Sequence, residues 1–230
     1  MGGDAPTGRR DSLRNRRLLT RTAREVFAEQ GLDAPLDVIA RRAGVGNATL
    51  YRHFPTRAAL VDEVFRDALS GTMDAGERAR AAEDAWTGLT RYLHAVFATL
   101  AADRGTNDLM TTSLEGVASL EAVHAHNHAT VTDLLRRGQA QGTVRPDLTT
   151  EDVLLALAAL GRVVPALNAV APDAWARPLA LLLDGFRAVP AAPDLPAPPP
   201  PAPDLPAPPL TAAQLGDVLL GLGPHRHRRR

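Results

Sequence analysis

Apolar residues recur every three or four positions along most of this 230-residue chain. That spacing places them on one face of a helix, whereas the alternation typical of strands is nearly absent. Leu19, Ala23, Val26 and Phe27 form the first such face, and Gly31 follows as its expected C-terminal end. The pattern therefore predicts an all-α fold.

Two short helical patterns follow, separated by a turn rich in glycine. The first spans residues 36–43, and Gly44 and Gly46 bracket the turn. Asn47 is the expected N-cap of the second short helix, and Thr56 is the expected N-cap of a longer helix. The hydrophobic spacing predicts further helices at about residues 83–102, 106–118, 120–141, 150–170 and 173–188. The last two are apolar on more than one face, so we expect a dimer interface to bury them on two sides.

The chain changes character after residue 189. Eleven of the twenty residues 190–209 are Pro, and APDLPAPP occurs twice among them. This composition favours extended polyproline II and predicts a linker or arm; the alternative is a ligand for another protein domain. Residues 210–222 have the apolar spacing of a short helix that docks back on the body, and the final HRHRRR is a basic tail.

Charge divides the chain into a basic head and an acidic body. Residues 1–57 hold 11 Arg against 6 acidic residues, and residues 58–230 hold 15 Arg against 20, although the whole chain has no formal net charge. A basic head suits the binding of a polyanion. The sequence contains no Cys, which excludes disulfides and thiolate metal sites. It has no apolar leader and no uninterrupted apolar run of about 18 residues, so we expect a cytoplasmic protein that does not enter membranes.

The two short helices, joined by a glycine turn behind a first helix, predict a helix-turn-helix. In such a motif the second short helix enters the major groove of DNA. Leu50 and Phe54 are four residues apart and are expected to face inward, against Ile39 and Leu19. The outward face then carries Thr49, Arg52 and His53, side chains that can hydrogen-bond base edges or phosphates. This polarity is explained if DNA is the partner of that face.

The order PLDVIARRAGV and then GNATLYRHFPTRAALVDEVF resembles the TetR family of bacterial transcriptional regulators over about 50 residues. The resemblance implies that seven positions meet DNA: Gly46, Asn47, Thr49, Tyr51, Arg52, His53 and Arg57. Arg57 stands where the family usually has Lys. The second helix begins at Ala34, Pro35 and Leu36, where the family usually has a Thr or Ser that caps the helix and contacts a phosphate. The structural alternatives are a core edge for Tyr51, a helix cap for Asn47 and packing on the fourth helix for His53.

The arm ahead of the first helix is a second candidate for contact with DNA. It carries Arg9, Arg10, Arg14, Arg16 and Arg17, and in the family that the chain resembles such an arm lies near the duplex. We expect one or two of these residues, Arg17 among them, to reach phosphates or the minor groove; the alternative is a solvated run of charge. Arg42, with Arg41 beside it, is a further candidate for phosphate contact.

The body also carries a family-like segment, LLRRGQAQGTVRPDLTTEDVLLALAAL. The resemblance implies a homodimer whose last two main helices pair with those of the second copy, and a cavity for a small-molecule effector between about residues 60 and 165. Candidate lining residues are Trp86, Tyr92, Phe97, Met110, Leu114, His124, His128 and Val131, with ordinary core packing as the alternative. Of the three histidines in HAHNH, only His124 and His128 share a helix face, so we expect no metal site.

These patterns predict four parts: an arm and helix-turn-helix (residues 1–60), a helical effector-binding and dimerisation domain (61–189), a Pro-rich linker (190–209), and a short helix with a basic tail (210–230). The function predicted is a repressor that binds a palindromic operator as a dimer and is released by a small molecule. The alternative is an activator, or a regulator that answers a partner protein. No nucleophile elbow, phosphate loop or HExxH motif occurs, so we expect neither an enzyme nor a cofactor.

Overall fold

The computed structural model describes residues 5–111, 116–188, 211–214 and 216, and for residues 5–9 and 170 it describes the backbone alone. The all-α prediction is confirmed, because these residues contain no strand beyond a single bridge between Val144 and Arg187. The main helices are α1 (Ala5–Gln30), α2 (Leu36–Arg42), α3 (Asn47–His53), α4 (Arg57–Arg80), α5 (Ala85–Ala102), α6 (Arg104–Met110), α7 (Ala118–Ala140), α8 (Thr150–Val170) and α9 (Ala176–Phe186).

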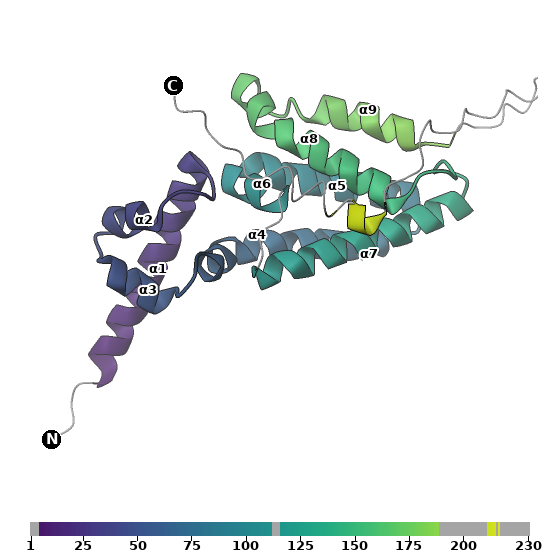
Figure 1. Cartoon of the computed structure of the whole chain (residues 1–230). Helices are drawn as coiled ribbons and strands as arrows, with labels where there is room; N and C mark the ends of the chain where they lie inside the picture. Colours follow the sequence, from purple (N-terminus) through teal and green to yellow (C-terminus); the bar gives the residue numbers. More distant parts are fainter. Residues whose placement is uncertain (1–4, 112–115, 189–210, 215, 217–230) are drawn as a thin grey trace, which may run out of the picture.

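The helices form a small head and a larger body (Figure 1). Helices α1, α2 and α3 lie together at one end, and α4 leads from them into a body built from α5 to α9. One buried cluster joins α1, α2, α3 and the start of α4 to α6 and the start of α7. A second cluster joins α5, α7, α8 and α9 with the far part of α4. Helices α4 and α7 contribute to both clusters, so head and body share one continuous framework.

The head has the core that the spacing predicts. Leu19, Ile39, Leu50 and Phe54 are each at most 1% exposed and belong to the same cluster. Gly31 ends α1 with φ of +82°, a backbone conformation that favours glycine. Burying these apolar faces fixes α3 against α1 and leaves the opposite side of α3 exposed to solvent.

The turn between α2 and α3 corrects one prediction. Gly44 has φ of +70°, and the chain re-enters a helix with Gly46, not Asn47, at the N-cap position. The carbonyl of Gly46 accepts hydrogen bonds from the amides of Thr49 (2.9 Å) and Leu50 (3.2 Å), so the backbone starts the helix without a side-chain cap. The predicted cap at Thr56 is confirmed, since its Oγ1 accepts a hydrogen bond of 3.1 Å from the Ala59 amide.

Helix α6 is shorter than the predicted helix at 106–118. It begins after Asp103, whose Oδ1 accepts a hydrogen bond of 3.1 Å from the Thr106 amide, and it ends at Met110. Pro165 in α8 has no N–H, which leaves the carbonyl of Gly161 without its usual partner within the helix. The side-chain amide of Asn107, fully buried, donates to that carbonyl at 2.8 Å and ties α6 to α8.

Helix α8 presents an apolar face that the rest of the described chain does not cover. Its segment Thr150–Ala169 has a mean hydropathy of 1.5 and is long and apolar enough to cross a membrane, yet only 22% of it is buried. In the structure α8 packs on α5, α6, α7 and α9. Val163 on α8 is 47% exposed, and Leu181 on α9 is 62% exposed. Together with the low burial of α8, these side chains form an apolar surface of the kind that binds a partner.

Candidate DNA-binding surface and internal cavity

The exposed side of α3 carries most of the predicted contact residues. Asn47 and Arg52 are exposed, Tyr51 is 51% exposed, and Thr49 and His53 are half-buried. Arg52 makes no hydrogen bond or ion pair with another described residue. The face therefore offers a guanidinium, an amide and two hydroxyl groups to a partner outside the chain, a mixture that suits base edges and phosphates.

Arg16, predicted as part of the DNA-binding arm, is held inside the head. Its Nη2 lies 2.8 Å from Glu63 Oε2, and its Nη1 donates to the His53 carbonyl at 3.1 Å. Its guanidinium carbon also lies 4.5 Å from the centre of the Phe54 ring. Hydrogen bonding to Arg16 lowers the pKa of Glu63 below its usual range. Arg16 therefore fixes α1 to the junction of α3 and α4.

Two other predicted arginines also have partners within the head. Arg57 Nη1 donates to the carbonyls of Leu32 (2.6 Å) and Ala34 (2.8 Å), just ahead of α2. Arg42 forms a two-pronged pair with Glu29, at 2.6 Å and 2.8 Å, and hydrogen bonding within this pair lowers the pKa of the Glu29 carboxyl. Whether either side chain also meets DNA stays a prediction.

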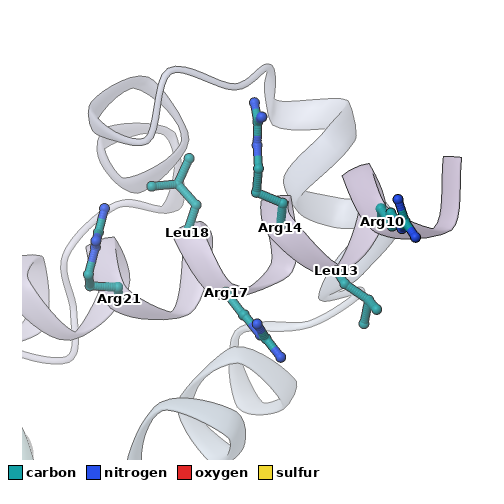
Figure 2. Close-up of a pocket in the computed structure, with 6 residues that line it drawn as sticks. All are labelled: Arg10, Leu13, Arg14, Arg17, Leu18 and Arg21. Carbon is teal, nitrogen blue, oxygen red and sulfur yellow. The ribbon is translucent and has the colours of Figure 1, made fainter. Parts of the chain in front are cut away.

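A row of arginines on α1 has no such partners. Arg10, Arg14, Arg17 and Arg21 are all exposed, and none makes an ion pair or hydrogen bond with another described residue. Figure 2 shows these four side chains projecting from α1 around Leu13 and Leu18, with Arg14 and Arg17 pointing in different directions. Their spacing of three or four residues starts all four side chains from one side of the helix, and the long side chains then spread apart. The row concentrates positive charge without internal neutralisation, which suits a polyanion.

The body contains a cavity of about 220 Å³ between α5, α6, α7 and α8. Its lining is mainly apolar with a few polar groups: Val96, Leu100, Met110, Thr111, His124, Asn127, His128, Leu154, Leu157 and Ala158, joined by Ala212 and Gly216 from the C-terminal segment. Burial lowers the pKa of His124, so its imidazole is neutral near pH 7. Such a lining fits a small, mostly apolar molecule with one or two hydrogen-bonding groups.

Three of the predicted lining residues, Met110, His124 and His128, lie at this cavity. Four others do not line it, because they pack elsewhere: Trp86 lies under the Arg187 guanidinium, Phe97 stacks on Trp175, Val131 is buried in the core, and Tyr92 lies behind the wall. The Tyr92 hydroxyl donates to Asn127 Oδ1 at 2.5 Å and so positions a lining residue. Leu114 lies outside the described residues.

The histidines of HAHNH point to separate places. His124 lines the cavity, His126 Nδ1 lies 3.6 Å from Glu77, and His128 Nε2 lies 3.4 Å from Glu151 at the cavity. Among the residues that the structure describes, no group of three or more His, Cys, Asp or Glu side chains is placed to hold a metal ion.

The joint between α6 and the C-terminal half of α1 contains an ion pair and a buried carboxyl group. Asp103, the N-cap of α6, lies 3.4 Å from Arg24 of α1. Asp108 is fully buried, and its Oδ2 would lie only 3.1 Å from a Cβ added at Gly31. Burial raises the pKa of Asp108 to about 6. The joint therefore contains a buried carboxyl group, next to Gly31 of the head, whose pKa is raised to about 6.

Comparison with known protein families decides the identity of these parts. Residues 19–64 match the family model described as bacterial regulatory proteins, tetR family. Residues 84–188 match a second model, described as the C-terminal domain of SbtR-like transcriptional regulators, so that the two models together span more than half of the chain. The chain belongs to the TetR family of transcriptional regulators. A search of curated proteins by sequence found no match.

Solved TetR-family structures are similar to most of the chain. A regulator from Mycobacterium vanbaalenii is 35% identical, covering 78% of this chain and 99% of its own, with a TM-score of 0.44. The regulator SCO0520 from Streptomyces coelicolor is 31% identical, covering 75% and 98%, with a TM-score of 0.47. A tetR-family protein from Rhodococcus RHA1 is 20% identical, covers 76% and 98%, and shares the fold with a TM-score of 0.61.

The family assignment makes the chain a DNA-binding transcriptional regulator, a class of protein that generally has no enzymatic activity. Two features lie outside both matched segments. The row from Arg10 to Arg17 precedes residue 19, and the C-terminal segment that reaches the cavity follows residue 188.

The sequence analysis did not predict Asn127, Ala212 and Gly216 as lining residues, because nothing in their local pattern signals contact with helices distant in the sequence.

Proposed function

We propose that this TetR-family regulator is a repressor that binds a palindromic operator as a homodimer and is released when a small molecule enters the body cavity. The observation that carries the proposal is the position of α6, which touches the cavity at one end and the DNA-binding head at the other. Met110 and Thr111 line the cavity, while Asp103 pairs with Arg24 of α1. Because α6 has seven residues and is roughly 10 Å long, a displacement of its cavity end also moves the end that contacts the head.

Coupling requires the effector to favour one arrangement of head and body over another. The side chain of Asn107 ties α6 to the Gly161 carbonyl of α8. Thr111 also packs closely on Gly161, since a Cβ added there would lie 2.7 Å from Thr111 Cγ2, so α6 and α8 have little room to move relative to each other. A ligand that displaces Met110 or Thr111 must therefore shift α6 as a unit. The shift is passed to α1 through Arg24, and it changes the spacing of the two heads in a dimer.

The dimer is supported by the uncovered face of α8 and α9. Only 22% of the apolar segment Thr150–Ala169 is buried within one chain, and Leu181 on α9 is 62% exposed. A second copy would cover both helices with the same surface, as expected for a two-fold interface. Two heads held in this way would present their α3 helices to major grooves about one helical turn, roughly 34 Å, apart.

The effector that fits best is a small, mainly apolar molecule with a hydrogen-bonding group. Leu154, Leu157 and Val96 offer apolar contact, and the amide of Asn127 keeps its donors for a ligand because its Oδ1 already accepts from Tyr92. The neutral ring of His124 adds a donor or acceptor without a charge.

The experiment is selection of sheared genomic DNA from the encoding organism with the purified full-length chain, followed by sequencing of the retained fragments. The proposal predicts a palindrome beside one or a few genes, and a reporter gene behind that fragment should be transcribed less when the protein is present. Retention that fades with salt and shows no preferred sequence would contradict specific regulation. Increased reporter transcription would instead identify an activator.

A further inference from the structure

The C-terminal segment contributes to the cavity although it lies beyond both family matches. Ala212 and Gly216 line the cavity together with residues of α5, α6, α7 and α8. In Figure 1 this segment is the short yellow helix drawn beside α7 and α8, far along the chain from both. Ala212 is also exposed to solvent, so this part of the lining lies at the rim.

The segment forms a helix start for a local reason. The Thr211 amide donates to Gln214 Oε1 at 2.9 Å, and the Gln214 amide donates to Thr211 Oγ1 at 3.2 Å. These reciprocal bonds are a capping box, a sequence-encoded signal for a helix N-terminus. The helix therefore begins at a defined residue, which fixes the directions of the side chains that follow.

One face of this helix meets the cavity. Ala212 and Gly216 are four residues apart and share a face, whereas Ala213 and Gln214 point in other directions. Both lining residues are small, and a Cβ added at Gly216 would meet no atom within 4 Å. The wall thus leaves space in the cavity that a larger side chain at either position would occupy.

We propose that residues 211–214 and 216 form a wall of the effector site, with Ala212 and Gly216 setting the size of the ligand. This inference rests on the proposed function in one respect, because it takes the cavity to be the effector site. It adds a specificity-determining element from outside the matched family segments.

Thiol accessibility tests the wall without any ligand. The sequence has no Cys, so Ala158→Cys places a single thiol in the cavity lining, at a residue that is 9% exposed. In the full-length chain, adding Ala212→Asp puts a charge against the apolar rim and should displace the segment. Alkylation of the thiol by iodoacetamide should then become about 10-fold faster.

The matched control is Ala213→Asp in the same Ala158→Cys chain. Both positions lie in the first turn, where an acidic residue favours the helix equally, so only the direction of the side chain differs. The control should change the alkylation rate by less than about 2-fold. A thiol from Ala79→Cys, which is 4% exposed and away from the cavity, reports general loosening of the fold. Equal rates for the two Asp variants would overturn the proposal, as would a parallel rise at position 79.

Binding of the neutral apolar dye N-phenyl-1-naphthylamine, followed by its fluorescence, tests the effect on ligand size. Ala212→Phe should weaken dye binding about 10-fold, and Ala213→Phe should leave it within about 2-fold. Equal affinities for these two variants would contradict the role in size selection. If the unmodified chain binds no dye while the thiol rates still differ, the wall stands and the proposed effector site fails.

Discussion

Arg52 and Arg57 show how two arginines of one motif come to have different roles. Arg52 is exposed on α3 without a partner among the described residues, whereas Arg57 donates to the carbonyls of Leu32 and Ala34. Arg52→Ala should therefore cost about 1–3 kcal/mol of specific operator binding and relax discrimination at one base step, with little change in stability. Titration of the selected operator and of a scrambled duplex measures this difference; equal losses on both would contradict a role in base recognition.

Arg57→Ala should act on the fold as well as on DNA. Losing two charge-assisted hydrogen bonds to the loop ahead of α2 should lower the free energy of unfolding by about 1–3 kcal/mol. If Arg57 also meets a phosphate, specific and nonspecific binding should weaken alike. Urea unfolding, with Arg52→Ala as the control of equal charge, separates the two effects. Unchanged stability in Arg57→Ala would show that the carbonyl contacts contribute nothing.

Asp108 should give the joint between head and body a pH dependence. Its folded pKa of about 6 lies above the ordinary 3.8 because burial disfavours the charged form; Arg104 and Arg162 oppose this effect, and Asp33 and Asp103 add to it. The folded state therefore binds the proton more tightly, and stability contributed by the neutral form is lost as pH rises from about 4 to about 6. At most, this loss is about 3 kcal/mol.

Asp108→Asn cannot ionise, so its free energy of unfolding relative to the unmodified chain should improve as pH rises through that window. Urea titrations from about pH 4 to about pH 7.5 measure the difference between the two chains. Taking the difference cancels the other carboxyl groups, such as Glu63, whose lowered pKa has the opposite effect on the pH dependence. A difference that stays constant with pH would mean that Asp108 ionises normally.

At the residue scale, the outward face of α3 could be predicted from helical spacing alone, because Leu50 and Phe54 define the buried side. The engagement of Arg16 with Glu63 and of Arg42 with Glu29 could not be predicted. Those pairs join residues 47 and 13 positions apart in the sequence, and only the packing of α1 on α4 and α2 brings them together. Net charge in a segment therefore overstates the charge that remains available to DNA.

At the scale of single helices, α1 offers the row of arginines that pairs with no other described residue. Replacing Arg10, Arg14 and Arg17 together with Gln should weaken binding to all duplexes. It should also reduce the slope of log K against log salt by about 0.9 for each phosphate that the variant no longer neutralises. The matched control replaces Arg78, Arg91 and Arg136, which are exposed on α4, α5 and α7, and should leave the slope unchanged. An unaltered slope in the α1 variant would place the row away from DNA.

The uncovered face of α8 and α9 makes a prediction about assembly. Leu181→Asp should place a charge in the proposed interface and convert dimers to monomers at micromolar concentration. Leu13→Asp changes an equally apolar side chain, 52% exposed on α1, and should leave the dimer intact. Sedimentation velocity distinguishes the species. A dimer that persists in Leu181→Asp would show that another surface joins the two copies.

Most helices could be predicted from periodicity, including α8 at 150–170 and the cap at Thr56. Two details could not. Asn47 has the right chemistry for an N-cap, but the positive φ of Gly44 brings the chain into the helix one residue earlier. The helix predicted at 106–118 ends at Met110, because apolar spacing alone cannot locate the end of a helix whose residues pack against α1, α5 and α8.

For the whole molecule, the sequence predicted a basic head on a helical body; the division at residue 60 stays a prediction, and the two family matches cover residues 19–64 and 84–188. Which residues line the cavity depends on how four helices pack, and sequence spacing does not reveal that packing. Phe97 and Trp86 are aromatic side chains that could contact a ligand. In the structure, however, Phe97 stacks on Trp175, and Trp86 packs under the guanidinium of Arg187. The predicted Pro-rich linker lies outside the described residues; of the helix predicted at 210–222, the described residues Ala212 and Gly216 line the cavity.

The measurement that tests the central claim most directly is a hydroxyl-radical footprint of the full-length protein on the DNA fragment that it enriches from the genome. A dimer that reads DNA with α3 predicts two protected patches, related by the symmetry of the palindrome and centred about one helical turn, roughly 34 Å, apart. Both patches should disappear for Arg52→Ala at the same protein concentration. Uniform protection that lacks symmetry and does not change in the Arg52→Ala variant would contradict specific operator binding. It would show that the head binds DNA only through its phosphates.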